Sequence, residues 1–344
     1  MSELPLAYGV PTASTGFLQR LPAAQASAQP DEAVATPPGR ADAQDLGDFV
    51  SFGDLPPMAD LPPAEPVVPH ESQLAAPRGE HWSESRRYEG PSAALRLHEE
   101  LLDFAHAFRP TRAEKAARRG LVSRVRAVVV SVFPDAQVKC FGSFDTGLYL
   151  PESDIDLVCL GTGVSSQKQK GRALHKLGDA LRRAPWAVTQ MEVVDKARVP
   201  IVKFVDGESG VAVDICLEET TGLQSSALAR KAAAKFPQYA PLVLFLKRWL
   251  NTRGLHDTYH GGVGSYLLQL MVIASLQHPP LDQRKPDLKG NLGAALVHFF
   301  ELYGLRLNYE AVGITVAEGG AFFAKREHGW VNADRPGLIC VLNP

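Results

Sequence analysis

Two stretches after residue 91 carry apolar side chains at helical spacing. In the first, the apolar positions end before Pro110 and are Leu95, Leu97, Leu101, Leu102, Phe104, Ala105 and Phe108. Recurrence every three to four residues predicts an amphipathic helix. Thr111, followed by Glu114, has the sequence of a capping box and predicts the start of a second helix. The apolar face of that helix holds Leu121, Val125, Val128, Val129 and Val132, and Pro134 ends it.

Runs of β-branched residues, separated by turn residues, follow and predict a small sheet. They cover residues 137–141, 155–160, 188–194, 199–205 and 211–217, with one helix expected at 172–184. Helical periodicity returns after residue 223, in segments 242–250, 266–276 and 292–303. We expect residues 305–344 to form a short irregular tail. The pattern therefore predicts an α+β protein with a leading helix, a sheet-containing unit and a helical domain.

The first 90 residues differ from the rest in composition. They hold 13 of the 26 prolines, 13 Asp and Glu, five Arg and no Lys, which gives a net charge of −8. Because no apolar period is sustained, this segment cannot bury enough surface to offset its chain entropy, and we expect a disordered, acidic tail rich in Pro and Ala. The remaining residues carry 31 Lys and Arg against 25 Asp and Glu, a surplus of +6 that permits a polyanionic partner.

Cysteine usage and hydropathy indicate the compartment. Cys140, Cys159, Cys216 and Cys340 lie far apart, three of them in apolar β-branched runs, and we expect them to be reduced and buried. The sequence has no run of about 18 apolar residues and no secretory pattern at its start, so it predicts neither a membrane span nor export. We therefore expect an intracellular protein without a membrane partner.

A pair of acids at alternate positions is the strongest chemical signal. Asp154 and Asp156 stand at the start of a predicted strand, where alternation points both side chains to one face with their α-carbons about 6.5–7 Å apart. Asp214 lies in another, otherwise apolar run, where burial without a partner would be costly. Carboxylates at this spacing can bridge two divalent ions for in-line phosphoryl transfer, and oxygen ligands favour Mg²⁺ over Zn²⁺. These acids therefore predict a two-metal site.

Gly142 and Ser143 follow the predicted strand 137–141. A glycine lets the backbone approach a phosphate closely, while amide groups and the serine hydroxyl can donate to phosphate oxygens. The pair alone is weak evidence. Combined with the spacing of the acids, it favours a phosphate-binding turn over a plain turn beside exposed strand acids.

Together these motifs resemble the polymerase β-like nucleotidyltransferases, in which Gly-Ser is followed after ten residues by Asp-x-Asp and later by an Asp in a strand. Within that superfamily the sequence is similar to the nuclear non-canonical poly(A) polymerases once called DNA polymerase sigma, the catalytic subunits of the TRAMP complex. The segments that carry the resemblance lie between residues 95 and 304 and are Leu97-His-Glu-Glu-Leu, Phe141-Gly-Ser-Phe-Asp-Thr-Gly-Leu-Tyr-Leu-Pro-Glu-Ser-Asp-Ile-Asp, Lys196-Ala-Arg-Val-Pro-Ile-Val-Lys-Phe, Asn291-Leu-Gly and Phe299-Phe-Glu-Leu-Tyr-Gly.

The resemblance implies a nucleotidyltransferase palm, a small mixed sheet with helices, beside a mainly helical central domain. It divides the chain into a tail at 1–91, a helix contributed to the central domain at 92–120, the catalytic domain at 121–224 and the PAP-associated central domain at 225–344. We expect that last domain to be C-terminally incomplete. After Leu338-Ile-Cys-Val-Leu342 the relatives continue through an Asp-Pro segment into a nucleotide-recognition loop, whereas this sequence has Asn343-Pro344.

Site residues also follow from the resemblance. The metal carboxylates, holding two Mg²⁺ ions with Mn²⁺ as a substitute, are Asp154, Asp156 and Asp214. The residues implied to bind the nucleotide are Gly142, Ser143, Ser225, Lys247, Ser265 and Tyr266. Among these, Lys247 would contact the triphosphate, Tyr266 would stack on the base and Ser225 would contact the ribose. Read without the resemblance, Lys247 is a solvated lysine and Tyr266 a core residue.

The function implied is template-independent addition of AMP from ATP to RNA 3′ ends, in nuclear RNA surveillance. A zinc-knuckle RNA-binding protein and a helicase are the implied partners. Two alternatives remain open at this point: a terminal uridylyltransferase, and a truncated, non-catalytic subunit that binds RNA or a protein partner.

A set of basic residues offers a path for the RNA. On the predicted second helix and beyond, the set comprises Arg118, Arg119, Arg124, Arg126, Arg230, Lys231 and Lys235. Such residues either contact phosphates or form an ordinary solvated helix face, and the sequence favours neither.

Overall fold

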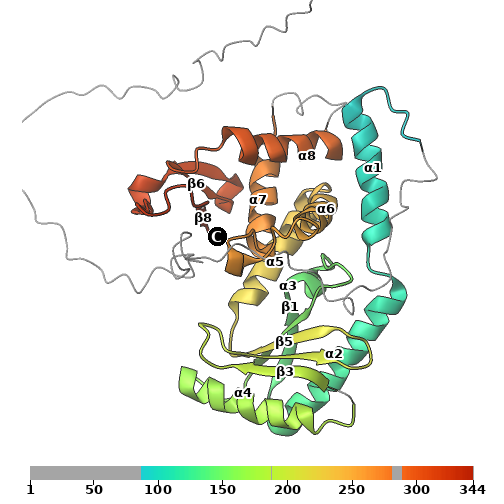
Figure 1. Ribbon diagram of the computed structural model, residues 1–344, viewed down its shortest axis with the longest axis vertical. Coiled ribbons are helices and arrows are strands. Elements are labelled where there is room, and N and C mark those ends of the chain that lie inside the picture. Colours follow the sequence, from blue (N-terminus) through green and yellow to red (C-terminus); the bar gives the residue numbers. More distant parts are fainter. Residues whose placement is uncertain (1–86, 187, 281–288, 344) are drawn as a thin grey trace, which may run out of the picture. The chain divides into compact units, whose positions relative to one another are not determined.

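The computed structural model describes residues 87–186, 188–280 and 289–343 (Figure 1). Most of the predicted acidic tail therefore lies outside the described residues. Two helices come first, α1 (Ala93–Phe108) and α2 (Arg112–Val132). The side chain of Ser92 caps α1, and Thr111 with Glu114 forms the predicted capping box of α2. Both helices are thus confirmed, with the ends that the caps and prolines indicated.

A five-stranded mixed sheet follows, with the strand order β1-β2-β5-β4-β3. The strands are β1 (Gln137–Phe141), β2 (Ile155–Leu160), β3 (Val188–Val194), β4 (Ile201–Asp206) and β5 (Ala212–Leu217). Neighbours pair antiparallel except β2 and β5, which run parallel. Helix α4 (Gln167–Arg182) separates β2 from β3, and the short helix α3 (Gly142–Thr146) follows β1 directly. The predicted strands are confirmed within one or two residues of their ends, while α3 was not predicted.

The two faces of this sheet have different surroundings. Ile155, Leu157 and Cys159 are buried in one apolar cluster with side chains of α2 and α4. Because strand side chains alternate, Asp156 between them points to the opposite face. Helix α5 (Thr221–Lys235) contacts β1 and α3, the elements beside that residue. Packing on one side of the sheet therefore directs the acids to the other.

Helices that precede and follow the sheet strands in the chain build a second apolar cluster. It joins α1 to α5, α6 (Tyr239–Asn251), α7 (Ser265–Gln277) and α8 (Leu292–Glu301), with Tyr239 fully buried inside it. Helix α1 contacts α8 and α6, although about 130 or more residues separate them in the chain (Figure 1). A π-helical turn (Leu302–Arg306) prolongs α8. The mixed α+β architecture is thus confirmed.

The expectation of an irregular tail after residue 304 was wrong. A three-stranded sheet lies there, in the order β7-β6-β8, from β6 (Val312–Thr315), β7 (Ala321–Ala324) and β8 (Val341–Leu342). Its strands are too short to show a period in the sequence. Lys325, which follows β7 and is fully buried, donates to the backbone carbonyls of Tyr309 and Leu338, and Ile314 and Val316 are buried in the helical cluster, so both kinds of contact hold this segment.

Two smaller expectations concern thiols and membranes. All four cysteines are free; three are buried, but Cys140 is only half-buried because β1 is an edge strand. In the part of the chain that the structure describes, no helix combines the length and the apolar character that a bilayer crossing requires.

Candidate active site

The parallel pairing of β2 with β5 brings the three predicted carboxylates together. Asp156 and Asp214 are direct partners in the register, and Asp154 precedes β2 by one residue. One ligand oxygen from each of the three lies within 4.8 Å of the others. These residues come from positions 60 apart in the chain, so the pairing of the strands, and not sequence proximity, makes the cluster.

The carboxylates affect one another's protonation. Burial, together with the charges of Asp154 and Asp214, raises the pKa of Asp156 to about 7, against the opposing charges of Lys247 and Lys203. Burial also raises the pKa of Asp214, while Lys203, with its Nζ 3.3 Å from Asp214 Oδ2, lowers it. Bringing three acids together is therefore costly to the protein by itself.

Two features of the cluster fit a bound cation. Asp214 Oδ1 is buried and has no hydrogen-bond partner in the described structure, so one oxygen faces the cluster without compensation. All three donors are carboxylate oxygens, the ligand type that Mg²⁺ and Mn²⁺ prefer. The residues present thus fit a hard divalent ion, and two such ions could share Asp154 and Asp156.

This charge cluster leads to a prediction about the metal-free protein. The pKa of Asp156 is higher in the folded protein than its unfolded value of 3.8, so the folded state holds the proton more tightly. The free energy of unfolding therefore falls as pH rises from about 4 to 7. One pKa unit corresponds to about 1.4 kcal/mol. The free energy of unfolding of Asp156→Asn, relative to that of wild type, should therefore rise by about 2–3 kcal/mol from pH 5 to pH 8. Urea unfolding in EDTA at both pH values measures this. The same difference in free energy of unfolding between variant and wild type at pH 5 and at pH 8 would contradict this prediction.

The turn at Gly142 is shaped by its contact with Asp156. Gly142 has φ +66°, a conformation that suits glycine, and a β-carbon there would lie 2.4 Å from Asp156 Oδ2. The adjacent Ser143 is the second residue of α3, and its hydroxyl has no hydrogen-bond partner among the described residues. The glycine is therefore required for the close approach of the turn to the carboxylates, and the Ser143 hydroxyl is available to a ligand.

Ser226 is a site neighbour that the sequence analysis missed. Its buried hydroxyl accepts a hydrogen bond from the Gly142 amide at 2.8 Å and donates to the Gly222 carbonyl at 2.9 Å. The Gly142 amide, expected to face a phosphate, is thus occupied within the protein. The hydroxyl of the predicted Ser225 donates to Thr221 in its own helix, so its contact with a ribose stays a prediction. No sequence motif distinguishes these adjacent serines; only the packing of α5 on β1 does.

Lys247 lies on α6 and reaches the loop before β2. Its Nζ donates to the Leu148 carbonyl at 3.0 Å. Burial lowers the pKa of Lys247, while the charges of Asp154, Glu152 and Asp156 raise it. The structure therefore brings this predicted residue into the electrostatic field of the carboxylates, and its contact with a triphosphate stays a prediction.

Ser265 and Tyr266 open α7, as the predicted helix 266–276 required. Ser265 is exposed, whereas Tyr266 packs against the helical cluster. The Tyr266 hydroxyl donates to Asn343 Oδ1 at 2.5 Å, which ties α7 to the segment that follows β8. Stacking of Tyr266 on a base stays a prediction.

The basic residues of α2 lie in different surroundings: Arg119 and Arg126 are exposed, and whether they contact phosphates stays a prediction. Arg118 is buried, with 3% of its surface exposed, and Arg124 pairs with Asp206 and Glu208. Arg230 on α5 pairs with Asp145. For Arg118 both alternatives, a path for RNA and a solvated helix face, are wrong.

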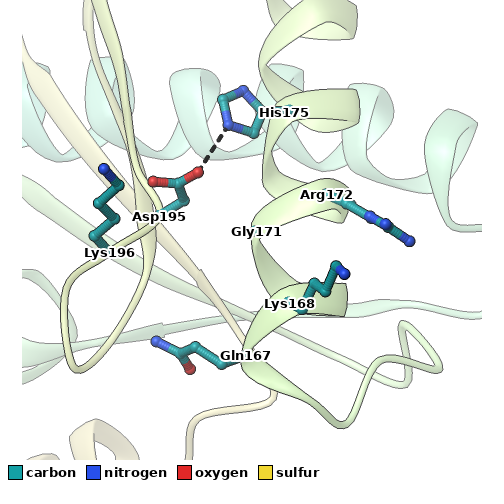
Figure 2. Close-up of a pocket in the computed structure, with 7 residues that line it drawn as sticks. All are labelled: Gln167, Lys168, Gly171, Arg172, His175, Asp195 and Lys196. Carbon is teal, nitrogen blue, oxygen red and sulfur yellow. Dashed lines mark hydrogen bonds and ion pairs between the residues drawn. The ribbon is translucent and has the colours of Figure 1, made fainter.

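A separate hollow of about 570 Å³ lies between α4 and the turn after β3 (Figure 2). Its lining is Gln167, Lys168, Gly171, Arg172, His175, Asp195 and Lys196, none of them a predicted site residue. His175 Nε2 lies 3.1 Å from Asp195 Oδ2. Figure 2 shows Lys168 and Arg172 pointing away from the turn that carries Lys196, so these cations do not converge on one ligand position.

Known proteins resemble this chain over the elements that build the carboxylate cluster. Residues 97–231 match the family described as "Poly(A) RNA polymerase, mitochondrial-like, central palm domain", and residues 291–344 match "Cid1 family poly A polymerase". A solved structure, "Structure and function of the polymerase core of TRAMP, a RNA surveillance complex", is similar with a TM-score of 0.67 and 32% identity, over 76% of this chain and 82% of that one. The similarity confirms the nucleotidyltransferase fold.

Two curated relatives differ in the activity that their names state. Poly(A) RNA polymerase cid14 of Schizosaccharomyces pombe is 36% identical over 261 residues, which are 75% of this chain and 38% of that protein. "Inactive non-canonical poly(A) RNA polymerase protein Trf4-2" of Drosophila melanogaster is 35% identical over 267 residues, 74% of this chain and 63% of that protein. This chain thus spans less than two thirds of either relative. The matched families and the solved polymerase core together show that the chain belongs to the non-canonical poly(A) RNA polymerases of the DNA polymerase sigma type, within the polymerase β-like nucleotidyltransferases.

Proposed function

We propose that this protein transfers AMP from ATP to the 3′ end of RNA without a template and releases pyrophosphate. The observation that carries the proposal is the cluster of three carboxylates with ligand oxygens within 4.8 Å of one another. Membership of the poly(A) RNA polymerase family identifies the reaction for which such a cluster serves. In that reaction the RNA 3′-oxygen forms a bond to the α-phosphorus of ATP, and the bond from that phosphorus to the β-phosphate oxygen breaks.

Each site residue has a role in this transfer. Asp154 and Asp156 would hold two Mg²⁺ ions and Asp214 one of them, where the ions would supply Lewis-acid stabilisation of charge on the attacking and leaving oxygens. Asp214 would also help to accept the proton of the 3′-hydroxyl. Lys247 would neutralise charge on the departing pyrophosphate, and the free Ser143 hydroxyl would donate to a phosphate oxygen.

The domain division proposed for this chemistry agrees with the two apolar clusters except that Leu148 and Leu150 of the catalytic range pack in the helical cluster. Residues 121–224 form the catalytic domain around the five-stranded sheet, and residues 92–120 and 225–344 form the central domain. The nucleotide contacts proposed for Ser225, Ser265 and Tyr266 come from helices of the central domain.

The cellular setting proposed is nuclear RNA surveillance. The solved relative is the polymerase core of TRAMP, described as an RNA surveillance complex. By this similarity we propose a zinc-knuckle RNA-binding protein and a helicase as partners of the present protein.

The assay is extension of a labelled oligo(A) RNA by the purified protein with Mg²⁺ and ATP, beside an Asp156→Asn control. The proposal expects a ladder of products and stoichiometric pyrophosphate with wild type only. A ladder that persists at the wild-type rate in the control would contradict the assignment of the carboxylate cluster as the catalytic centre. No ladder with any nucleotide would favour a non-catalytic subunit, the outcome named for the Drosophila relative.

A further inference from the structure

Arg118 is the one arginine with less than a tenth of its surface exposed among the described residues, at 3%. It lies on α2 and not on any element that carries a carboxylate of the cluster. Burial lowers the pKa of its guanidinium, a sign that the site is costly for a cation, while Asp154 and Glu152 among other groups raise it. A guanidinium is buried without a large loss of stability only where acceptors bind its donors. The acceptors that Arg118 binds therefore show which part of the protein it stabilises.

The hydrogen bonds and the ring contact of this guanidinium run to one loop, the loop that leads into β2. Nη2 donates to the Pro151 carbonyl at 2.9 Å, and Nη1 lies 3.4 Å from the Asp154 carbonyl. The group also lies over the ring of Tyr149, 4.6 Å from its centre. Arg118 therefore contacts both ends of segment 149–154. At the second end it binds the backbone of Asp154, a predicted metal ligand.

The rest of that loop has its own supports. Leu150 and Ser153 bond to each other in a turn, and the Glu152 carboxylate accepts from Arg248 and Asn251 of α6. Removal of Arg118 should therefore leave the loop folded but release the backbone at Asp154. That distinction separates a role in positioning from a role in folding.

We propose that Arg118 is a positioning residue for the reaction, which fixes Asp154 at the spacing from Asp156 and Asp214 that metal binding requires. The inference rests on the proposed function of the carboxylate cluster. Residues that orient a ligand from behind typically contribute about 10–100-fold to metal affinity or activity. Arg118 contacts the ligand's own main chain, so we expect an effect of that size.

The test uses the full-length Arg118→Met and Arg118→Lys variants, with Lys115→Met as a matched loss of charge at an exposed position of the same helix. In metal-free protein, hydrogen exchange at residues 149–155 should accelerate in Arg118→Met and stay at the wild-type rate in Lys115→Met. Mn²⁺ titration by electron paramagnetic resonance should show affinity about tenfold or more weaker in Arg118→Met. In transfer assays kcat should fall while KM for RNA stays within about twofold, and excess Mn²⁺ should restore part of kcat.

Wild-type Mn²⁺ affinity in a folded Arg118→Met protein would overturn the inference. If that variant does not fold, Arg118→Lys decides: it keeps the charge but not the planar fork, so a severalfold loss of Mn²⁺ affinity supports the inference and an unchanged affinity overturns it. Absence of AMP transfer by wild type would count against the proposed function alone, because exchange and Mn²⁺ binding still measure what Arg118 does.

Discussion

Asp156→Asn is expected to lower AMP transfer by at least about a thousandfold, which corresponds to about 4 kcal/mol of transition-state stabilisation. Asp156 on β2 lies between the end of β1, which the Gly142 turn follows, and Asp214 on β5. Asparagine keeps the shape of the side chain but removes the charge that a divalent ion needs. Single-turnover extension of a labelled RNA with saturating Mg²⁺ and ATP measures the rate.

The same loss is expected for Asp154→Asn and for Asp214→Asn, and a double variant should lose little more because the three residues act as a unit. Asp135→Asn, an exposed acid in the turn before β1, is the matched control and should transfer at the wild-type rate. If Asp156→Asn were to extend RNA within tenfold of wild type, the carboxylates would not be the catalytic centre.

Gly142→Ala is the second change with a large expected effect. The β-carbon would sit 2.4 Å from Asp156 Oδ2 and would displace that carboxylate, while the left-handed φ of +66° adds about 1–2 kcal/mol of strain. We expect a fall in transfer of about a hundredfold or more, since misplacement of a reacting group by about 1 Å costs that much. Urea unfolding and single-turnover transfer on the same preparation separate the two consequences.

Gly210→Ala provides the matched control for backbone strain. Gly210 has φ +67° and no atom within 4 Å of a β-carbon, and it lies in the turn between β4 and β5. It should lose similar stability yet keep wild-type activity. Equal activity losses in the two variants would mean that strain, and not the contact with Asp156, explains the effect of Gly142→Ala.

The part of the fold that sequence could predict is the part with a strong period. The helices up to residue 132 and the five strands carry regular apolar patterns bounded by caps, turn residues and prolines, and the structure follows them. Strand alternation likewise predicts that Asp154 and Asp156 lie on one face. The convergence of Asp214 was also foreseeable, because an acid in a buried strand needs a partner.

The remainder depends on contacts between distant segments. Ser226 and Arg118 lie 84 and 36 residues from the main-chain atoms that they bind, Gly142 and Asp154, and neither belongs to a local motif. The sequence left Arg118 either in a path for RNA or on a solvated helix face, and both alternatives place it on the surface, where arginines usually lie. The small sheet of β6, β7 and β8 was missed because its strands are only two to four residues long, and because a buried lysine and backbone pairing between distant segments help to hold it.

The most direct test of the central claim is the base composition of the product made under competition. Purified protein is incubated with RNA, Mg²⁺ and all four NTPs at equal concentration, and the added 3′ tails are sequenced beside those from Asp156→Asn. The account predicts tails of adenosine with wild type and no tails with the variant. Tails of uridine would identify a terminal uridylyltransferase, and identical tails from both proteins would contradict the assignment of the carboxylate cluster as the catalytic centre.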